Sequence, residues 1–305
     1  KSLFNNIFSC YHHEAHAYSA SLLSHFDEGV VLVADARGDF ESTTMWKFNR
    51  SAKKPLKKLY SNTSSDSLGF FYGRITGLLG FKPCRHEGKV TGLAAQGNPS
   101  KALHLMKKMI DFQDGEIKSK LSKYYVPFFE NYSKELIEEI SAYSKEDIAA
   151  AAQLHLENLF VKLINHIYKK HNLDGMPIML AGGVFGNVKA NQIIKDLDVV
   201  NDAFIQPQMN DGGLCLGAAA ALQHSAGITI KPLQNVYLGP EPSINKFINS
   251  ENSLLIKQLE SPIEKIIFHL KQNKVIGLVR GRMEFGPRAL CHRSIIYKTS
   301  DRSAN

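Results

Sequence analysis

The stretch from Met176 to Ile194, MPIMLAGGVFGNVKANQII, indicates the fold class. Its apolar start predicts a buried strand, the paired glycines predict a tight turn, and the following residues have a helical pattern. Residues 202–222, DAFIQPQMNDGGLCLGAAAAL, repeat this order with a loop that ends in Asn-Asp-Gly-Gly and a helix of small residues. Two βα units in succession predict an α/β protein.

The segments before these units extend the same prediction. VVLVADA at 30–36 predicts a buried strand, and TTMWKFN predicts the strand that returns beside it. Residues 30–49 therefore predict a β-hairpin with Asp35 and Gly38 at its tip. The preceding helix, which contains the histidine-rich CYHHEAHAYSAS of residues 10–21, is expected to end with Gly29 as its C-cap.

Other segments predict the remaining elements. We expect helix, loop and helix over 67–97, a charged amphipathic insertion over 100–145, and a long helix over 145–172. Proline and glycine over 227–243 place a domain boundary near 230–240, and 274–297 predicts a strand, a Gly-Arg loop and a second strand.

Composition narrows the class of protein. The 305 residues carry a net charge of +8, but the lysine-rich runs contain no interleaved aromatic residues, which does not favour nucleic-acid binding. Binding of phosphorylated small molecules accounts for the charge equally well. The four cysteines form no CxxC pair and no apolar run reaches bilayer length, so we expect a cytoplasmic protein without membrane spans. The sequence has no initiator Met, and its first residues lead almost directly into the histidine-rich segment, which suggests a fragment of a longer protein.

His12 and His16 are the first candidate site residues. Four residues apart, they share one face of a helix, whereas His13 is turned away. Two imidazoles are an incomplete metal site, and Asp211 in the second βα loop is the best third ligand. Such a set suits Fe(II), Mn(II) or Zn(II). The alternatives are ordinary polar surface or hydrogen-bonded core positions for the histidines, and helix capping for Asp211.

Several further groups are candidates for anion binding. Gly182 and Gly183, followed by Asn187, bring backbone amides to the start of a helix, although a tight turn without ligand has the same pattern. The remaining candidates lie in a hairpin, in a Gly-rich segment and in a Gly-Arg loop, where polar turns and surface ion pairs are the alternatives. They are Asp35, Gly38, Thr43, Glu87, Lys89, Arg282, Arg288 and Arg293.

Seven ordered motifs together resemble the O-carbamoyltransferase family of nodulation-factor and antibiotic biosynthesis. They are HHEAHAYSA, DARGDFESTT, SLGFFYGRITGLLGF, EGKVTGLAAQG, LAGGVFGNVKAN, NDGGLCLGAA and GRMEFGPRAL. The resemblance implies a first domain over 1–232, incomplete at its N-terminus, similar to the tRNA threonylcarbamoyl-transferring protein, with an actin/Hsp70-like ATPase fold. It implies that 233–305 begin a second α/β domain similar to the threonylcarbamoyl-adenylate-forming fold.

The family also implies residue roles. His12, His16 and Asp211 match its metal ligands, with Fe(2+) the expected ion. Asp35, Gly38, Gly182, Gly183 and Asn187 match its nucleotide-contacting segments, and Thr43, Glu87 and Lys89 are expected beside them. Arg282 and Arg288 lie in the block that matches its second domain. His13 and Arg288 are the expected catalytic residues, with His13 directed toward the carbamoyl group or its acceptor.

The implied chemistry has two stages. Carbamoyl phosphate and ATP give a carbamoyl-adenylate, from which the carbamoyl group passes to a hydroxyl of a small-molecule or glycan acceptor. A homodimer is a further expectation. The alternatives are a tRNA threonylcarbamoyladenosine-type transferase, which shares the metal and ATP cleft, and a nucleotide-binding module that is inactive as an isolated fragment.

Overall fold

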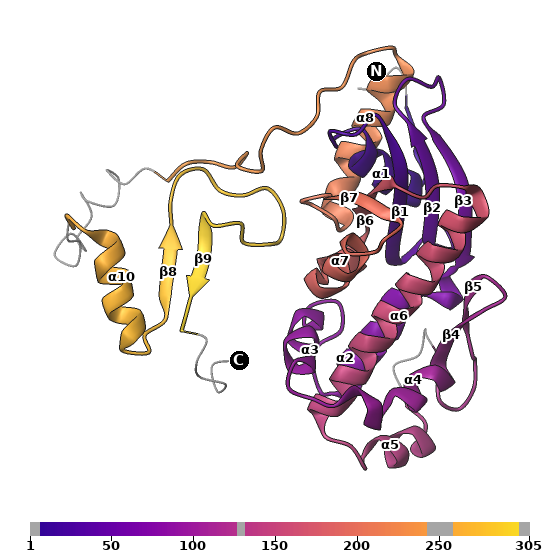
Figure 1. Ribbon diagram of the computed structural model, residues 1–305, viewed down its shortest axis with the longest axis vertical. Coiled ribbons are helices and arrows are strands. Elements are labelled where there is room, and N and C mark those ends of the chain that lie inside the picture. The colour runs from indigo at the N-terminus through magenta and orange to yellow at the C-terminus, as the bar shows by residue number, and fades with distance from the viewer. Residues whose placement is uncertain (1–6, 127–131, 243–258, 299–305) are drawn as a thin grey trace, which may run out of the picture. The chain divides into compact units, whose positions relative to one another are not determined.

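The computed structural model describes residues 7–126, 132–242 and 259–298. The chain divides into two compact units, Lys1–Leu233 and Gln234–Asn305. No helix among the described residues has both the length and the apolar character that a bilayer crossing requires. The elements of the first unit, shown with their labels in Figure 1, are α1 (His12–Ser21), β1 (Glu28–Gly38), β2 (Glu41–Asn49), β3 (Leu56–Thr63), α2 (Leu68–Leu78), α3 (Glu87–Ala94), α4 (Leu103–Met109), β4 (Ile110–Gln113), β5 (Glu116–Ser119), α5 (Lys134–Ile140), α6 (Lys145–His171), β6 (Met176–Ala181), α7 (Val188–Lys195), β7 (Val200–Ile205) and α8 (Leu214–Ser225).

A mixed five-stranded sheet organises the first unit, with strand order β3-β2-β1-β6-β7. β1 pairs antiparallel with β2 and parallel with β6, and β6 pairs parallel with β7. Both βα units, the hairpin and the long helix expected from the sequence are therefore present, and the α/β class is confirmed.

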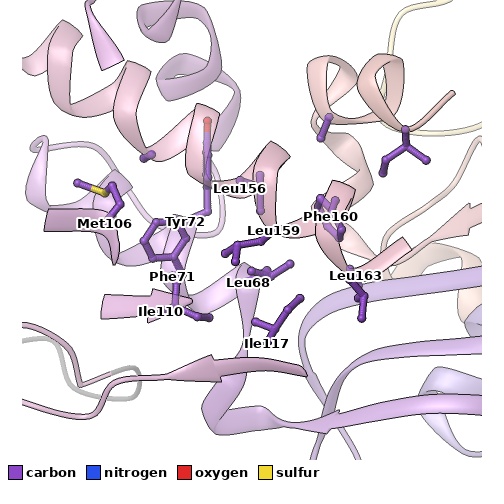
Figure 2. Packing of buried hydrophobic residues seen from close by; sticks show 14 of the residues in the cluster. Leu68, Phe71, Tyr72, Met106, Ile110, Ile117, Leu156, Leu159, Phe160 and Leu163 are labelled. Atoms are coloured by element: carbon purple, nitrogen blue, oxygen red, sulfur yellow. The ribbon is translucent and has the colours of Figure 1, made fainter. Parts of the chain in front are cut away.

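The two faces of the sheet carry separate cores because successive side chains of a strand point to opposite faces. Val30 and Leu32 of β1 belong to a large cluster with α2 and α6, and Val31 and Val33 belong to a smaller cluster with α1 and α8. Figure 2 shows side chains of α2, α6 and the β4–β5 hairpin meeting in the large cluster, with Leu159 and Phe71 among them. The two clusters hold α1 and α6 on opposite faces of the sheet.

Gly29 does not cap a helix. The helix α1 ends at Ser21, and Gly29 lies in β1 with an extended backbone, φ 158°. A Cβ atom there would lie 2.6 Å from the carbonyl oxygen of Pro177, so glycine allows β1 to approach the start of β6 closely. The error arose because a glycine after a helix is a common C-cap, whereas close strand packing has no local signal.

The hairpin tip also differs from expectation. Gly38 pairs with Glu41 and stands at the tip, but the two turn residues are Asp39 and Phe40. Asp35 lies earlier, where the β1–β2 register breaks between Ala34 and Gly38. Such a bulge redirects side chains out of the regular alternation.

The described part of the second unit is a helix and a two-stranded antiparallel sheet: α10 (Pro262–Lys271), β8 (Ile276–Val279) and β9 (Arg293–Ile296). The loop between its strands is organised by Glu284, whose Oε1 accepts the backbone N–H groups of Leu290, His292 and Arg293 at 2.7–2.9 Å. Burial would raise the pKa of Glu284, but these N–H donors lower it to about 2.

Candidate metal centre

His12 and His16 lie one turn apart on α1, as their spacing predicts, with ring centroids 4.9 Å apart. The Nε2 atoms of His12 and His16 lie 3.5 and 3.2 Å from Oδ2 of Asp35, respectively. Both Nε2 atoms lie 3.5 Å from Oδ1 of Asp211. Two imidazoles and two carboxylates thus meet from α1, β1 and the loop before α8.

Helix packing brings these distant segments together. A Cβ atom on Gly217 of α8 would lie 1.8 Å from the carbonyl oxygen of Ala15, so only glycine lets α8 cross α1 this closely. Asp211 lies in the short 3₁₀ turn that leads into α8, where the side chain of the N-cap residue Asn210 accepts the N–H of Gly212 at 3.1 Å. The α1–α8 contact therefore places Asp211 opposite His12 and His16.

The side chain of Asp35 is oriented by a hydrogen bond within its own strand. Its Oδ1 accepts the N–H of Ala36 at 2.6 Å, which leaves Oδ2 directed at the histidines. Burial would raise the pKa of this carboxyl, but the hydrogen bonds with His12 and His16 hold it well below its usual range. For His16, burial lowers the pKa, and the contacts with Asp211 and Asp35 outweigh that effect and raise it.

The donor spacing is compatible with one bound metal ion. Charge-assisted hydrogen bonds between nitrogen and a carboxylate are about 2.7–2.9 Å long, shorter than the 3.2–3.5 Å observed. Metal–ligand bonds of about 2.1 Å in a tetrahedron put neighbouring ligand atoms about 3.4 Å apart. The four ligand atoms all lie within 4.8 Å of one another, so they can surround one divalent transition ion.

The four residues differ in exposure, which gives the centre one open side. His16 is fully buried, whereas the side chain of Asp211 is 71% exposed. A ligand reaching the centre would therefore approach past Asp211. We call His12, His16, Asp35 and Asp211 the donor cluster.

Two family models match this chain. The model described as carbamoyltransferase N-terminus matches residues 1–220, and the model described as carbamoyltransferase C-terminus matches residues 268–305. The chain belongs to the carbamoyltransferase family. This confirms the family expected from the seven motifs.

Curated relatives match nearly the whole of this chain. Uncharacterized protein MJ1051 of Methanocaldococcus jannaschii is 35% identical over 304 residues, covering 94% of this chain and 56% of that protein. Nodulation protein NolNO of Sinorhizobium fredii is 30% identical over 302 residues, covering 93% of this chain and 42% of that protein. The chain thus spans about half the length of these relatives. The crystal structure of HypF from T. kodakarensis covers 73% of this chain and 37% of its own, with 13% identity and a TM-score of 0.48.

His13 does not join the donor cluster. It is fully buried, and its Nδ1 lies 3.2 Å from the Thr44 hydroxyl, which accepts the indole N–H of Trp46 at 2.9 Å. Burial and the neighbouring His12 lower the pKa of His13 to about 4. The observed contacts are those of a neutral core histidine that anchors α1 to β2.

Among the residues expected to contact a nucleotide, the glycine turn lies beside the donor cluster and Asn187 caps a helix. Gly182 has φ 101°, and a Cβ there would lie 2.2 Å from the carbonyl oxygen of Ala34; a Cβ on Gly183 would lie 3.3 Å from Oδ1 of Asp35. The glycine turn therefore adjoins the donor cluster. Asn187 caps α7 by accepting the N–H of Ala190, and its side chain also exchanges hydrogen bonds with Gln153.

The other expected nucleotide contacts are less accessible or engaged elsewhere. Thr43 is fully buried in β2. On α3, Glu87 accepts the N–H of Cys84 at 2.6 Å, and Lys89 lies 5.9 Å from the ring centroid of Phe81.

The arginines of the second unit were expected to form a fork for anions. Instead, Arg282 donates to the carbonyl oxygens of Leu238 and Gly239, both at 3.0 Å, and Arg293 donates to those of Arg280 and Gly281. Their guanidinium groups hold the loop together. Arg288 lies on the exposed part of the same loop.

Sequence reasoning assigned Asp35 to a nucleotide and missed it as a member of the donor cluster. The available signal was its position directly after the buried apolar run VVLVA, where a carboxylate interrupts a strand. The bulge that turns Asp35 toward α1 could not be seen in the sequence.

Proposed function

We propose that this carbamoyltransferase holds one divalent transition metal, Fe(2+), at His12, His16, Asp35 and Asp211. Membership of the family supports the activity, and the spacing of the donor cluster is the observation that carries the metal assignment. Imidazole with carboxylate is a donor set that also suits Zn(2+) and Mn(2+).

The proposed reaction follows the family chemistry. Water hydrolyses carbamoyl phosphate to carbamate and phosphate, and a carbamate oxygen then attacks the α-phosphorus of ATP, which breaks the bond to the β-phosphate bridging oxygen and gives a carbamoyl-adenylate and pyrophosphate. An acceptor hydroxyl then attacks the carbamoyl carbon, the bond from that carbon to the adenylate oxygen breaks, and AMP leaves with the electron pair while the hydroxyl proton passes to a base. A metal at the donor cluster would supply polarisation of the carbamoyl oxygen and orientation of the acceptor.

We assign the orientation of the reacting groups to residues of this chain. His16 and Asp35 are held by α1 and by the β1 bulge, so their geometry is fixed before a substrate arrives. The turn at Gly182 and Gly183 adjoins Asp35, and Gly183 within it is exposed. We assign the nucleotide to this side, within an actin/Hsp70-like ATPase domain, with Gly38, Thr43, Glu87, Lys89 and Asn187 in the surrounding segments.

The second unit is proposed to begin the carbamoyl-adenylate-forming domain, with Arg288 on its exposed loop and Arg282 within it. The match of residues 268–305 to the carbamoyltransferase C-terminus favours this function over a tRNA-modifying transferase. The acceptor is proposed to be a small molecule or glycan with a free hydroxyl.

Pyrophosphate release from ATP, measured with and without carbamoyl phosphate, tests the proposal. We expect release that depends on carbamoyl phosphate, accompanied by a carbamoyl mass increment on one member of a panel of hydroxyl compounds. Asp211→Asn is expected to abolish the mass increment, whereas Asp174→Asn, at an exposed site between α6 and β6, serves as the matched control. ATP consumption that is the same without carbamoyl phosphate would refute the adenylate route.

A further inference from the structure

A buried pair of side-chain amides joins α6 to the end of the glycine turn. Gln153 lies on α6, and Asn187 is the N-cap residue of α7, directly after the turn that begins with Gly182 and Gly183. Nδ2 of Asn187 donates to Oε1 of Gln153 at 2.8 Å, and Nε2 of Gln153 donates to Oδ1 of Asn187 at 3.2 Å. The two residues are only 6% and 9% exposed, so both hydrogen bonds are shielded from water.

Every hydrogen-bonding position of the Gln153 amide is occupied. Besides its bonds with Asn187, its Oε1 accepts the hydroxyl of Tyr72 at 2.7 Å, and its Nε2 donates to Oε1 of Glu157 at 2.8 Å. A primary amide has two N–H donors and two acceptor lone pairs, so all four are used. Because an ionised carboxylate only accepts hydrogen bonds, Glu157 determines which end of the amide is the nitrogen. The side chain of Gln153 therefore has one favoured orientation.

The position of Asn187 determines the path of the glycine turn. Its backbone N–H donates to the carbonyl oxygen of Val184 at 3.0 Å, which closes the turn just before α7. The turn also contacts α6 through the ring of Phe185, whose centroid lies 5.4 Å from that of Phe160. One apolar contact and one polar contact thus hold the segment between the paired glycines and α7 on α6.

The polar contact is an expensive way to join two elements. Burying amides and a tyrosine hydroxyl is unfavourable unless every one of these groups finds a partner. Phe160 and Phe185 already join α6 to the turn without that penalty. A satisfied polar network adds a single, specified arrangement of its members. This arrangement matters where the turn adjoins Asp35 of the donor cluster, because a misplacement of about 1 Å is enough to slow a group transfer.

We propose that Gln153 is a positioning residue for the nucleotide. Its amide fixes Asn187, and Asn187 fixes the backbone of the turn at Gly182 and Gly183, to which the proposed function assigns the nucleotide. Within the described part of the chain, the hydrogen bonds of Gln153 reach no member of the donor cluster. This inference rests on the proposed function and adds to it the residue that prepares its nucleotide side.

Titration calorimetry of the full chain with ATP, in the absence of carbamoyl phosphate, tests this role. Gln153→Glu keeps the shape of the side chain but directs an oxygen atom instead of an N–H at Glu157 and at Oδ1 of Asn187. We expect ATP to bind about tenfold more weakly, a loss typical of broken hydrogen bonds that involve a charged partner. Gln153→Met removes the same hydrogen bonds without adding a charge, and an equal loss of ATP affinity is expected.

Three controls separate positioning from charge and from folding. Gln192→Glu makes the same chemical change at an exposed position of α7 and is expected to leave ATP affinity unchanged. Metal content should be the same in every variant, because the donor cluster comes from α1, β1 and the loop before α8. Glu157→Gln, added to Gln153→Glu, returns an N–H donor opposite the new carboxylate and is expected to recover most of the lost ATP affinity.

Tyr72→Phe is a milder variant for the case that the Gln153 variants do not fold. It removes one hydrogen bond of the network and is expected to weaken ATP binding about threefold. Unchanged ATP affinity in the folded variants, even with a lowered thermal midpoint, would show a merely structural role and overturn the proposal, as would an unsubstituted protein that binds no ATP. Pyrophosphate release is measured on the same preparations. Release that does not depend on carbamoyl phosphate would refute the proposed function and leave the comparison of ATP affinities intact.

Discussion

Gly217→Ala is predicted to weaken metal binding without changing any proposed ligand. A Cβ at residue 217 would lie 1.8 Å from the carbonyl oxygen of Ala15, whereas carbon–oxygen contacts in proteins are essentially never shorter than 3.0 Å. The difference of these two values requires α1 and α8 to separate by about 1.2 Å or more. Because Asp211 leads directly into α8, its distance from His12 and His16 increases by a similar amount.

The size of the effect follows from this displacement. Overpacking of this kind costs about 1–3 kcal/mol of unfolding free energy. Misplacement of a metal ligand lowers affinity about 10–100-fold, as the loss of a supporting contact does. The assays are metal content of the purified protein by mass spectrometry and metal affinity by competition with a chelator.

Gly92→Ala is the matched control for Gly217→Ala. Gly92 lies inside α3, and a Cβ atom there would meet nothing within 4 Å. This substitution is expected to stabilise the helix by about 1 kcal/mol and to leave metal content unchanged. Unaltered metal affinity in Gly217→Ala would refute the reasoning that the α1–α8 contact positions Asp211.

Three further predictions concern the donor cluster, the second unit and the core. His16→Ala removes a buried donor and is expected to abolish metal retention, whereas the exposed His25→Ala retains it; equal metal content in the two proteins would contradict the ligand assignment. Glu284→Gln should lower the thermal midpoint most above pH 4.5, because the carboxylate has a pKa of about 2 in the folded state and its stabilisation is lost as the pH falls toward that value; an equal deficit at pH 6 and pH 3 would contradict this. Leu159→Ala, in the fully buried centre of α6, should cost about 2–5 kcal/mol in chemical denaturation, and a cost below about 1 kcal/mol would show that this core is loosely packed.

The α/β class could be predicted from the sequence because the patterns that indicate it are local. The apolar run and paired glycines at 176–194 predict β6, the turn and α7, and the helical spacing at 145–172 predicts α6. Gly29 was misassigned because its role depends on Pro177, a residue distant in the chain that only the sheet brings near.

Part of the donor cluster could also be predicted because the signals for it are local in the sequence. The pairing of His12 with His16 follows from helical periodicity alone, and Asp211 was identified from its accessible loop. The contribution of Asp35 depends on a bulge, and the separation of His13 into the core depends on Thr44 and Trp46 of β2. The contacts of Arg282 with backbone carbonyls were hidden because a loop conformation decides whether a guanidinium group is available.

An anomalous-scattering difference map from crystals of the purified protein, recorded at a transition-metal absorption edge, tests the central claim most directly. We predict a single strong peak bonded to Nε2 of His12 and His16 and to the carboxylates of Asp35 and Asp211, with bonds of about 2.1 Å. A map with no peak at this position, or with the metal bound to other residues, would contradict the account.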